Sequence, residues 1–501
     1  MQRKLVQLKE ILAELDDLRR IQAVMDWDQQ TYMPSGGAED RGNQLATLAR
    51  LEHKRWTAPR LGKLLDELSA ATAGLDPDSD DACLVRVTQT HFDKKNRVPG
   101  KWVAEFAHLA TVSQQAWMRA RSESNFAIFQ PHLEKVVEMR RQYAAFFAPY
   151  THVYDALLDE FEPGMKTAEV QEIFSVLRGE QVALVKAIAG RPEVDASFLT
   201  LDYPEPTQED FGVKIIQRFG YDFQRGRQDR AAHPFCTSFG LGDVRITTRF
   251  KTDRLATALF GTMHETGHAL YDLGFDPTLT RTPLCDGASM AVHESQSRMW
   301  ENLVGRSLPF WKFAYPRLQQ AFPAQLGGVN LDAFYRAINR VQPSFIRVEA
   351  DEATYNLHIM LRLELEIALM EGSLEVKDLP SAWNERFHAY LGLTPPNDTV
   401  GVLQDIHWSG GMIGYFPTYA LGNLVSVQLW EKIQAEIPDL DAQIERGEFS
   451  ALLAWLRRNV HRHGAKFKPQ DLIQSVTGSR ISAQPYLRYL KTKYKAIYGL
   501  G

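Results

Sequence analysis

The sequence predicts a mainly α-helical fold with one small β region. Apolar residues recur at helical spacing through most of the chain, beginning with Leu5, Leu8, Ile11, Leu12 and Leu15. The exception is the segment 233–250, HPFCTSFGLGDVRITTRF, where two glycines separate short stretches and the second stretch is rich in β-branched residues. That pattern is typical of a hairpin. No run of 18 or more apolar residues occurs, so we expect no membrane span.

The predicted helices follow one another along the chain. In residues 1–22 charges interrupt the apolar positions, so this segment is predicted to be an amphipathic helix rather than a signal peptide. The segments with the same periodicity or with helix-start signals are 137–150, 170–189, 255–275, 286–305 and 355–372.

The chain is predicted to form one large domain over residues 1–501. The length of 501 residues alone favours about three domains. However, the two candidate linkers, 72–82 and 201–210, are neither long nor simple enough to separate independent units. We expect an N-terminal helical lobe at roughly 1–205 and a catalytic portion at roughly 206–501, with the lobes interleaved.

Charge and cysteine content restrict the partners and the compartment. Lys and Arg total 57 against 62 Asp and Glu, a net charge of -5, which is unlike the basic surface that nucleic acids require. Three cysteines cannot form a disulfide framework and are typical of a reducing compartment. We therefore expect a cytoplasmic protein that binds neither nucleic acid nor membrane.

Residues 263–272, MHETGHALYD, contain an HExxH pattern on the predicted helix 255–275. His264 and His268 are four residues apart, so their rings lie one turn apart on one face and can both reach a Zn²⁺ ion. Glu265 lies about 100° around the helix, where a carboxylate can act as general base on a water held at the metal. The alternative is that these are three ordinary polar residues on one helix.

A catalytic zinc needs a third protein ligand and an open fourth position. Glu294 is the predicted third ligand, because 26 residues after His268 leave room for the chain to turn and return antiparallel. Asp286 is predicted to cap the helix of Glu294, and His293 is expected to point about 100° away from Glu294. The other acids were excluded as ligands because they are too near or on other faces: Asp272, Asp276 and Glu301.

The sequence resembles the carboxypeptidase Taq family of zinc metallocarboxypeptidases, whose fold is similar to the neurolysin-like helical peptidases. The resemblance covers nearly the whole chain and rests on MDWDQQTYMP (25–34), HPF (233–235), DVRIT (243–247), HETGH (264–268), HESQ (293–296), IRVEAD (346–351) and GVLQDIHW (401–408). It implies removal of single residues from peptide C-termini by a homodimer with a deep groove between two mainly helical lobes. Many related zinc peptidases place an Asp four residues after the Glu ligand, where this chain has Arg298, so the orienting partners of both histidines are unassigned.

A carboxypeptidase must recognise a free α-carboxylate, and the planar fork of arginine matches that anion. Arg347 is the leading candidate, in the first turn of a helix expected to begin near residue 343. A structural salt bridge with a nearby acid is its alternative role. Arg245 is the second candidate, and pairing with Asp243 is its alternative. His233 precedes a proline that keeps it out of a helix, so its ring is predicted either to face the cleft or to pack structurally.

Attack on a peptide carbonyl creates an oxyanion, which a neighbouring His or Tyr stabilises. His407, with Tyr415 or Tyr419 downstream in QDIHWSGGMIGYFPTY, is predicted to meet this need, although the aromatic residues could be core. Tyr419 is also predicted to be a substrate-binding residue. The glycines between them permit a close backbone approach or a mobile lid. An exposed strand edge of the hairpin is a further hypothesis for holding an extended peptide.

The resulting prediction is a zinc metallocarboxypeptidase of broad specificity, with zinc-bound water as nucleophile and Glu265 as general base. Co²⁺ is a possible substitute for the metal. One alternative is a zinc endo-oligopeptidase. The other is a non-catalytic peptide-binding protein in which a structural zinc joins two helices.

Overall fold

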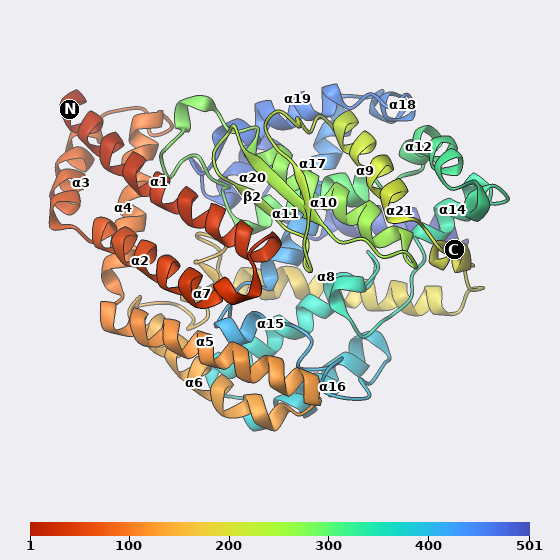
Figure 1. Cartoon of the computed structure of the whole chain (residues 1–501), viewed down its shortest axis with the longest axis horizontal. Helices are drawn as coiled ribbons and strands as arrows, with labels where there is room; N and C mark the ends of the chain where they lie inside the picture. The colour runs from red at the N-terminus through yellow and green to blue at the C-terminus, as the bar shows by residue number, and fades with distance from the viewer. Residues whose placement is uncertain (501) are drawn as a thin grey trace.

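The computed structural model describes residues 1–500 and is built mainly of helices (Figure 1). The helices that precede the first strand are α1 (Gln2–Thr31), α2 (Ala38–Trp56), α3 (Pro59–Thr72), α4 (Asp80–Arg97), α5 (Gly100–Glu123), α6 (Phe126–Ala145), α7 (Asp155–Leu158), α8 (Thr167–Ala189) and α9 (Glu205–Phe219). The predicted mainly α fold is confirmed. No helix in residues 1–500 is both long and apolar enough to cross a bilayer.

Helix α1 buries the apolar stripe that the sequence predicts. Leu5, Leu8, Leu12 and Leu15 are buried, and Ile11 is only partly covered. This i, i+3, i+4 spacing places the leucines on one side of the helix, while the charged residues between them face solvent. Helix α1 therefore packs against the core with the side that carries these leucines.

Along the chain, three strands follow α9 and precede α10, and they form one sheet. It consists of β1 (Gln228–Arg230), β2 (Cys236–Ser238) and β3 (Val244–Thr248), in the order β1-β3-β2. Strands β2 and β3 form the predicted antiparallel hairpin, with Thr237 opposite Arg245. Strand β1 runs parallel to β3, with Asp229 opposite Thr247, and was not predicted. Strand β2 is therefore an edge strand.

The second half of the chain supplies the helices that surround the site. Helix α10 (Leu255–Asp272) is followed by α11 (Met290–Arg298), which continues into a π-helical turn, η4 (Met299–Val304). The remaining helices are α12 (Leu308–Ala321), α13 (Pro323–Leu326), α14 (Leu331–Ile338), α15 (Tyr355–Glu371), α16 (Leu379–Leu391), α17 (Pro417–Glu436), α18 (Leu440–Glu445), α19 (Ser450–Asn459), α20 (Pro469–Thr477) and α21 (Gln484–Tyr498).

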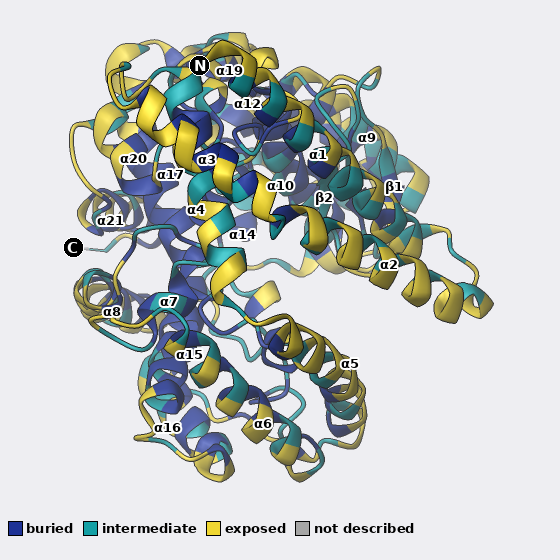
Figure 2. Cartoon of the chain, turned by 90° about the vertical axis from the view of Figure 1, so that its left-hand side faces the viewer, coloured by how far each residue is buried: buried dark blue, intermediate teal, exposed yellow. Residues whose placement is uncertain are grey.

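The helices gather in two groups that do not follow chain order (Figure 2). Helices α5 and α6 lie with α15 and α16, while α1 to α4 lie with α9, α10 and α17. Helices α15 and α17 are buried on nearly all sides, which is why their apolar residues are not confined to one face. One cluster of buried side chains runs from Leu5 to Tyr498 and includes members of both groups.

Candidate metal centre

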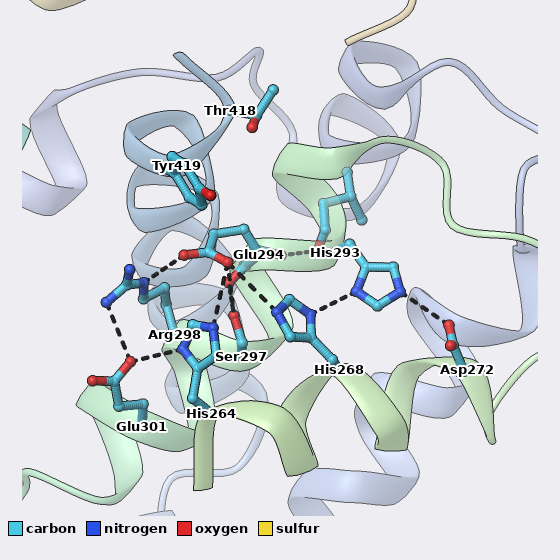
Figure 3. A network of polar contacts seen from close by, with 12 residues as sticks. His264, His268, Asp272, His293, Glu294, Ser297, Arg298, Glu301, Thr418 and Tyr419 are labelled. Carbon is cyan, nitrogen blue, oxygen red and sulfur yellow. Dashed lines mark hydrogen bonds and ion pairs between the residues drawn. The ribbon is translucent and has the colours of Figure 1, made fainter. Parts of the chain in front are cut away.

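His264 and His268 lie one turn apart on α10, on the side that faces α11. Their ring centroids are 4.9 Å apart. The Nε2 atom of each ring is 3.6 Å from Oε2 of Glu294 on α11, and one donor atom from each of the three residues lies within 4.8 Å of the others. Figure 3 shows the two rings and this carboxylate converging on one point. Two imidazole nitrogens and one carboxylate oxygen form a donor set that fits a catalytic zinc with an open position.

Two glycines allow the close helix packing that brings these residues together. A Cβ atom on Gly267 of α10 would lie 2.5 Å from the backbone oxygen of Gln296 in α11. A Cβ atom on Gly422 of α17 would lie 2.6 Å from both Cβ and Cγ of Glu294. Side chains at these positions would overlap α11. Helix α11 is therefore held between two glycine-bearing helices, and the position of Glu294 follows from backbone packing.

Ser289 caps the start of α11, not Asp286 as the sequence analysis predicted. The Ser289 hydroxyl accepts a hydrogen bond from the amide of Val292, at 3.1 Å. Asp286 instead accepts from the amide of Gly287, at 2.8 Å, and pairs with Arg19 of α1. The prediction failed because an ion pair from a distant helix competes for Asp286, and sequence spacing does not reveal such a partner.

Glu162 is a buried carboxyl group at the same helix start. It is 0% exposed, and its Oε2 accepts from the amide of Ala291 at 3.3 Å. Burial raises the pKa of Glu162 to about 8, although hydrogen bonds from Ser289 and Ala291 oppose the shift. The carboxyl group is therefore mostly protonated at neutral pH, and it supports α11 as a neutral acid.

This raised pKa predicts the effect of Glu162→Gln on stability. The pKa of the folded state, about 8, lies above the ordinary value of 4.5. The stability that this group contributes is therefore fully present below pH 4.5 and is lost as the pH rises towards 8. The glutamine variant lacks this loss, so its free energy of unfolding should rise relative to the parent by about 1 kcal/mol per pH unit in this window. Melting temperatures of both proteins between pH 5 and 9 test this, and a constant difference between them would contradict it.

Glu301 orients His264. Its Oε2 lies 2.8 Å from Nδ1 of His264, the ring nitrogen that does not face Glu294. From the sequence, Glu301 was not predicted to be a ligand, and no orienting partner of His264 was predicted. Glu301 is seven residues after Glu294, which is close to two helical turns and returns a side chain to the same side. That spacing was the available signal.

His268 is oriented through a two-residue chain that the sequence analysis missed. Nδ1 of His268 is 2.6 Å from Nδ1 of His293, and Nε2 of His293 is 3.0 Å from Oδ1 of Asp272 (Figure 3). With Nε2 of His268 facing Glu294, its Nδ1–H donates to His293, and His293 donates in turn to Asp272. The prediction that His293 points away from Glu294 fits this arrangement, because His293 turns towards His268 instead.

Arg298 completes a ring of contacts around the three predicted ligands. Its Nε donates to Oε1 of Glu294 at 2.7 Å, and its Nη1 donates to Oε2 of Glu301 at 3.2 Å. The guanidinium lies 4.3 Å from the centroid of the Tyr355 ring. Burial alone would raise the pKa of Glu294, but Arg298 and the histidines outweigh burial and lower it. Glu294 therefore presents an ionised oxygen, Oε2, to both histidines.

Glu265 lies beside this cluster in a buried position, 7% exposed. Burial raises the pKa of its carboxyl group to about 7; His264 opposes the shift and Glu294 adds to it. A carboxyl group whose pKa is near neutral exchanges protons readily at neutral pH. This is the property that a general base requires.

His407, Tyr415 and Tyr419 form a second cluster of side chains. Nε2 of His407 is 3.2 Å from the hydroxyl of Tyr419, and the His407 and Tyr415 ring centroids are 5.5 Å apart. Tyr419 is three residues before Gly422 on α17, and Figure 3 shows it beside Glu294. Burial lowers the pKa of His407 to about 4, so the ring is neutral at pH 7.

Arg347 joins this cluster in a 3-10 turn, η5 (Arg347–Glu349), and not in the first turn of a helix as predicted. Helix α15 begins only at Tyr355, and in the turn before it Asp351 accepts hydrogen bonds from the amides of Ala353 and Thr354. Arg347 donates from Nε and Nη2 to Asp405, at 3.1 and 2.9 Å, and from Nη1 to the Tyr355 hydroxyl.

Two other predicted substrate-binding residues lie apart from these clusters. Arg245 on β3 donates to both oxygens of Asp243, at 2.8 and 2.7 Å, and lies between the rings of Trp27 and Phe239. This is the ion pair that the sequence analysis offered as its alternative role. His233 is exposed in the loop before β2.

The edge of β2 is partly covered. Arg20 of α1 donates to the backbone oxygen of Ser238 at 2.8 Å. One backbone acceptor of the predicted peptide-binding edge is thus already occupied by the chain itself. An added peptide strand would have to use the groups at the Cys236 end of β2.

Comparison with known proteins gives consistent results. The family model described as carboxypeptidase Taq (M32) metallopeptidase matches residues 7–494. "Thermostable carboxypeptidase 1" of Thermus thermophilus is 44% identical, and "Carboxypeptidase 1" of Bacillus subtilis is 40% identical; the matches cover 98% of this chain and 98% and 97% of those proteins. The crystal structure of an M32 carboxypeptidase from Deinococcus radiodurans R1 superposes with a TM-score of 0.96 at 43% identity, covering 99% of each chain.

Proposed function

The chain belongs to the carboxypeptidase Taq (M32) family of metallopeptidases, and from that premise we propose that its metal is zinc, held by His264, His268 and Glu294. The protein is a metallocarboxypeptidase. The observation that carries the site assignment is the convergence of three donor atoms within 4.8 Å of one another. When bound there, zinc would supply a Lewis acid that activates water and polarises the scissile carbonyl. Co²⁺ is a substitute that the same donors accept.

Glu265 is the general base in this proposal. Its carboxylate takes a proton from the attacking water and then delivers that proton to the nitrogen of the leaving amine. The cleaved C–N bond is thus replaced by a C–O bond, and the transferred proton ends on the new amine. A pKa near 7 suits a group that must accept and release a proton in each cycle.

His407 and Tyr415 are proposed to donate hydrogen bonds to the oxygen that becomes negative during attack, with Tyr419 beside them. A neutral His407 supports this role, because it can donate without adding a positive charge. Tyr415 remains protonated, since burial raises its pKa to about 12.

Arg347 is proposed to bind the C-terminal carboxylate of the substrate. Arg347 and Arg362 share one counter-ion, Asp405, and the exposed side-chain fractions of the two arginines are 6% and 0%. Two buried cations with one anion leave an excess positive charge, which is costly unless another anion arrives. A free α-carboxylate is such an anion.

Arg347→Met with paired peptides tests this proposal. For the parent protein, amidating the peptide C-terminus should abolish most cleavage. In the variant, kcat/KM for the free acid should fall about 10- to 100-fold, and the free acid and the amide should be cleaved at similar rates. A larger loss in Arg245→Met would move the role to that residue. Melting temperatures of both variants check that the buried ion pair is not needed for folding.

The same peptides separate the alternative functions. Undiminished cleavage of amidated peptides by the parent protein would favour the endo-oligopeptidase. A protein that binds zinc and peptides but cleaves neither form would favour the non-catalytic alternative, although Glu265 has no role in a purely structural zinc site. Broad specificity predicts that peptides with different C-terminal residues are cleaved at comparable rates.

Assembly and location are further proposals. A single domain over 1–501 is supported by the buried cluster that joins the first and last helices. A homodimer follows from the family resemblance, and light scattering should give twice the mass of one chain. A cytoplasmic location is supported by three cysteines that form no disulfide.

A further inference from the structure

Glu366 is a fully buried carboxyl group on α15, 0% exposed, and it accepts three hydrogen bonds. Trp408 donates from Nε1 to Oε1 at 2.8 Å. The backbone amide of Gly414 and the hydroxyl of Tyr154 donate to Oε2, at 3.0 and 2.5 Å. Burial raises the pKa of Glu366 to about 7, and the three donors partly offset that shift.

Two of these donors are next to the proposed oxyanion residues in the sequence. Trp408 follows His407 directly, and Gly414 precedes Tyr415 directly. One oxygen of Glu366 therefore holds the beginning of the segment 407–415, and the other oxygen holds its end. A buried carboxylate is costly without such donors, so the segment is fixed at both ends by the same side chain.

Close packing at two glycines also leaves the segment 407–415 little room to move. Gly411 and Gly414 have φ angles of +70° and +100°. A Cβ atom on Gly411 would lie 2.2 Å from the Phe106 ring on α5, and one on Gly414 would lie 2.6 Å from the backbone oxygen of Leu157 in α7. The segment is therefore confined by α5 and α7 in addition to its hydrogen bonds with Glu366.

We propose that Glu366 is a positioning residue for catalysis, whose two oxygens set the separation and orientation of His407 and Tyr415. The proposal rests on the oxyanion roles given to those two residues above. Glu366 is 0% exposed, so a substrate would not reach it, and its hydrogen bonds go to Tyr154, Trp408 and Gly414 and not to the proposed metal ligands. Its effect on catalysis would therefore pass through the segment 407–415. Its loss should lower the rate of the chemical step and leave substrate binding unchanged.

Glu366→Gln is the first test. The amide keeps the volume and one acceptor oxygen, but its NH₂ group opposes one of the three donors. We expect kcat to fall about 10- to 100-fold, the size of effect that small misplacements of catalytic groups produce, with KM unchanged. An unchanged kcat, or a rise in KM that accounts for the whole loss, would overturn the proposal.

A double-mutant comparison separates positioning from general stabilisation. Glu366→Gln is added to a protein that already carries His407→Ala and Tyr415→Phe. If Glu366 acts through these residues, its substitution should cost far less there than in the parent. An equal loss in both backgrounds would overturn the positioning role. If His407→Ala and Tyr415→Phe alone leave kcat intact, the proposed function of that cluster fails first, which is a distinguishable result.

The donors provide a matched pair of variants that remains informative even if Glu366→Gln does not fold. Trp408→Phe removes a hydrogen bond from inside the segment, and Tyr154→Phe removes one from outside it. Both leave the carboxylate in place with two donors. We expect Trp408→Phe to lower kcat about 10-fold or more and Tyr154→Phe to leave it nearly unchanged, at similar melting temperatures. Equal losses in the two variants would overturn the proposal.

Discussion

Glu265→Gln should lower kcat by about 10³-fold while the metal, which we propose is zinc, remains bound at one ion per chain. The amide has the shape of the carboxylate but cannot accept a proton from the attacking water. His264, His268 and Glu294 are unchanged, so the metal is held as before. The effect should therefore appear in turnover and not in metal content.

Metal analysis and single-turnover kinetics on one preparation check this result. The matched control is Glu162→Gln, which makes the same exchange at another buried carboxyl group near α11 and should keep full activity. Residual activity within a few-fold of the parent would remove Glu265 from its role. Loss of zinc together with activity would instead show that the variant had damaged the site itself.

His264→Ala should lose both the metal and all peptide hydrolysis. A catalytic site has only three protein ligands, and removing one leaves the donors of His268 and Glu294 alone. It also removes the imidazole that Glu301 contacts and leaves Glu301 with only Arg298 and Arg306 as its charged partners. Equilibrium dialysis against zinc buffers gives the affinity directly, independent of activity.

Glu301→Gln should give a smaller effect than His264→Ala in the same experiment. All three ligands remain, but His264 loses its carboxylate partner, so zinc affinity should fall only about 10- to 100-fold. Activity should return at high zinc concentration. Tight one-to-one zinc binding by His264→Ala would contradict the ligand assignment. An unchanged affinity in Glu301→Gln would show that the contact does not orient the ring.

The residues that converge at the site were predictable from the sequence where their relative positions depend on a single helix or on two successive helices. Four-residue spacing fixes the relation between His264 and His268 on any helix. Glu294 required only the additional assumption that the next helix returns antiparallel, and α11 does so. The stripe of leucines on α1 followed from the same reasoning.

The surrounding partners were not predictable, because they depend on how distant segments meet. Arg19 of α1 diverts Asp286 from its expected cap, and Asp405, 58 residues further along the chain, pairs with Arg347. The missed strand β1 is only three residues long and polar, so it carries no alternating pattern. Its place in the sheet depends on pairing with β3, which the sequence of β1 alone does not encode.

The glycines at positions 267 and 422 have a consequence for redesign. Because a Cβ atom at either position would overlap α11, α10 and α17 are already as close to α11 as their backbones allow. A side chain added at position 267 could only move His264 and His268 away from Glu294. An engineer who wants the pocket to prefer a smaller ion must therefore exchange the proposed ligands themselves, since the scaffold behind them cannot close further.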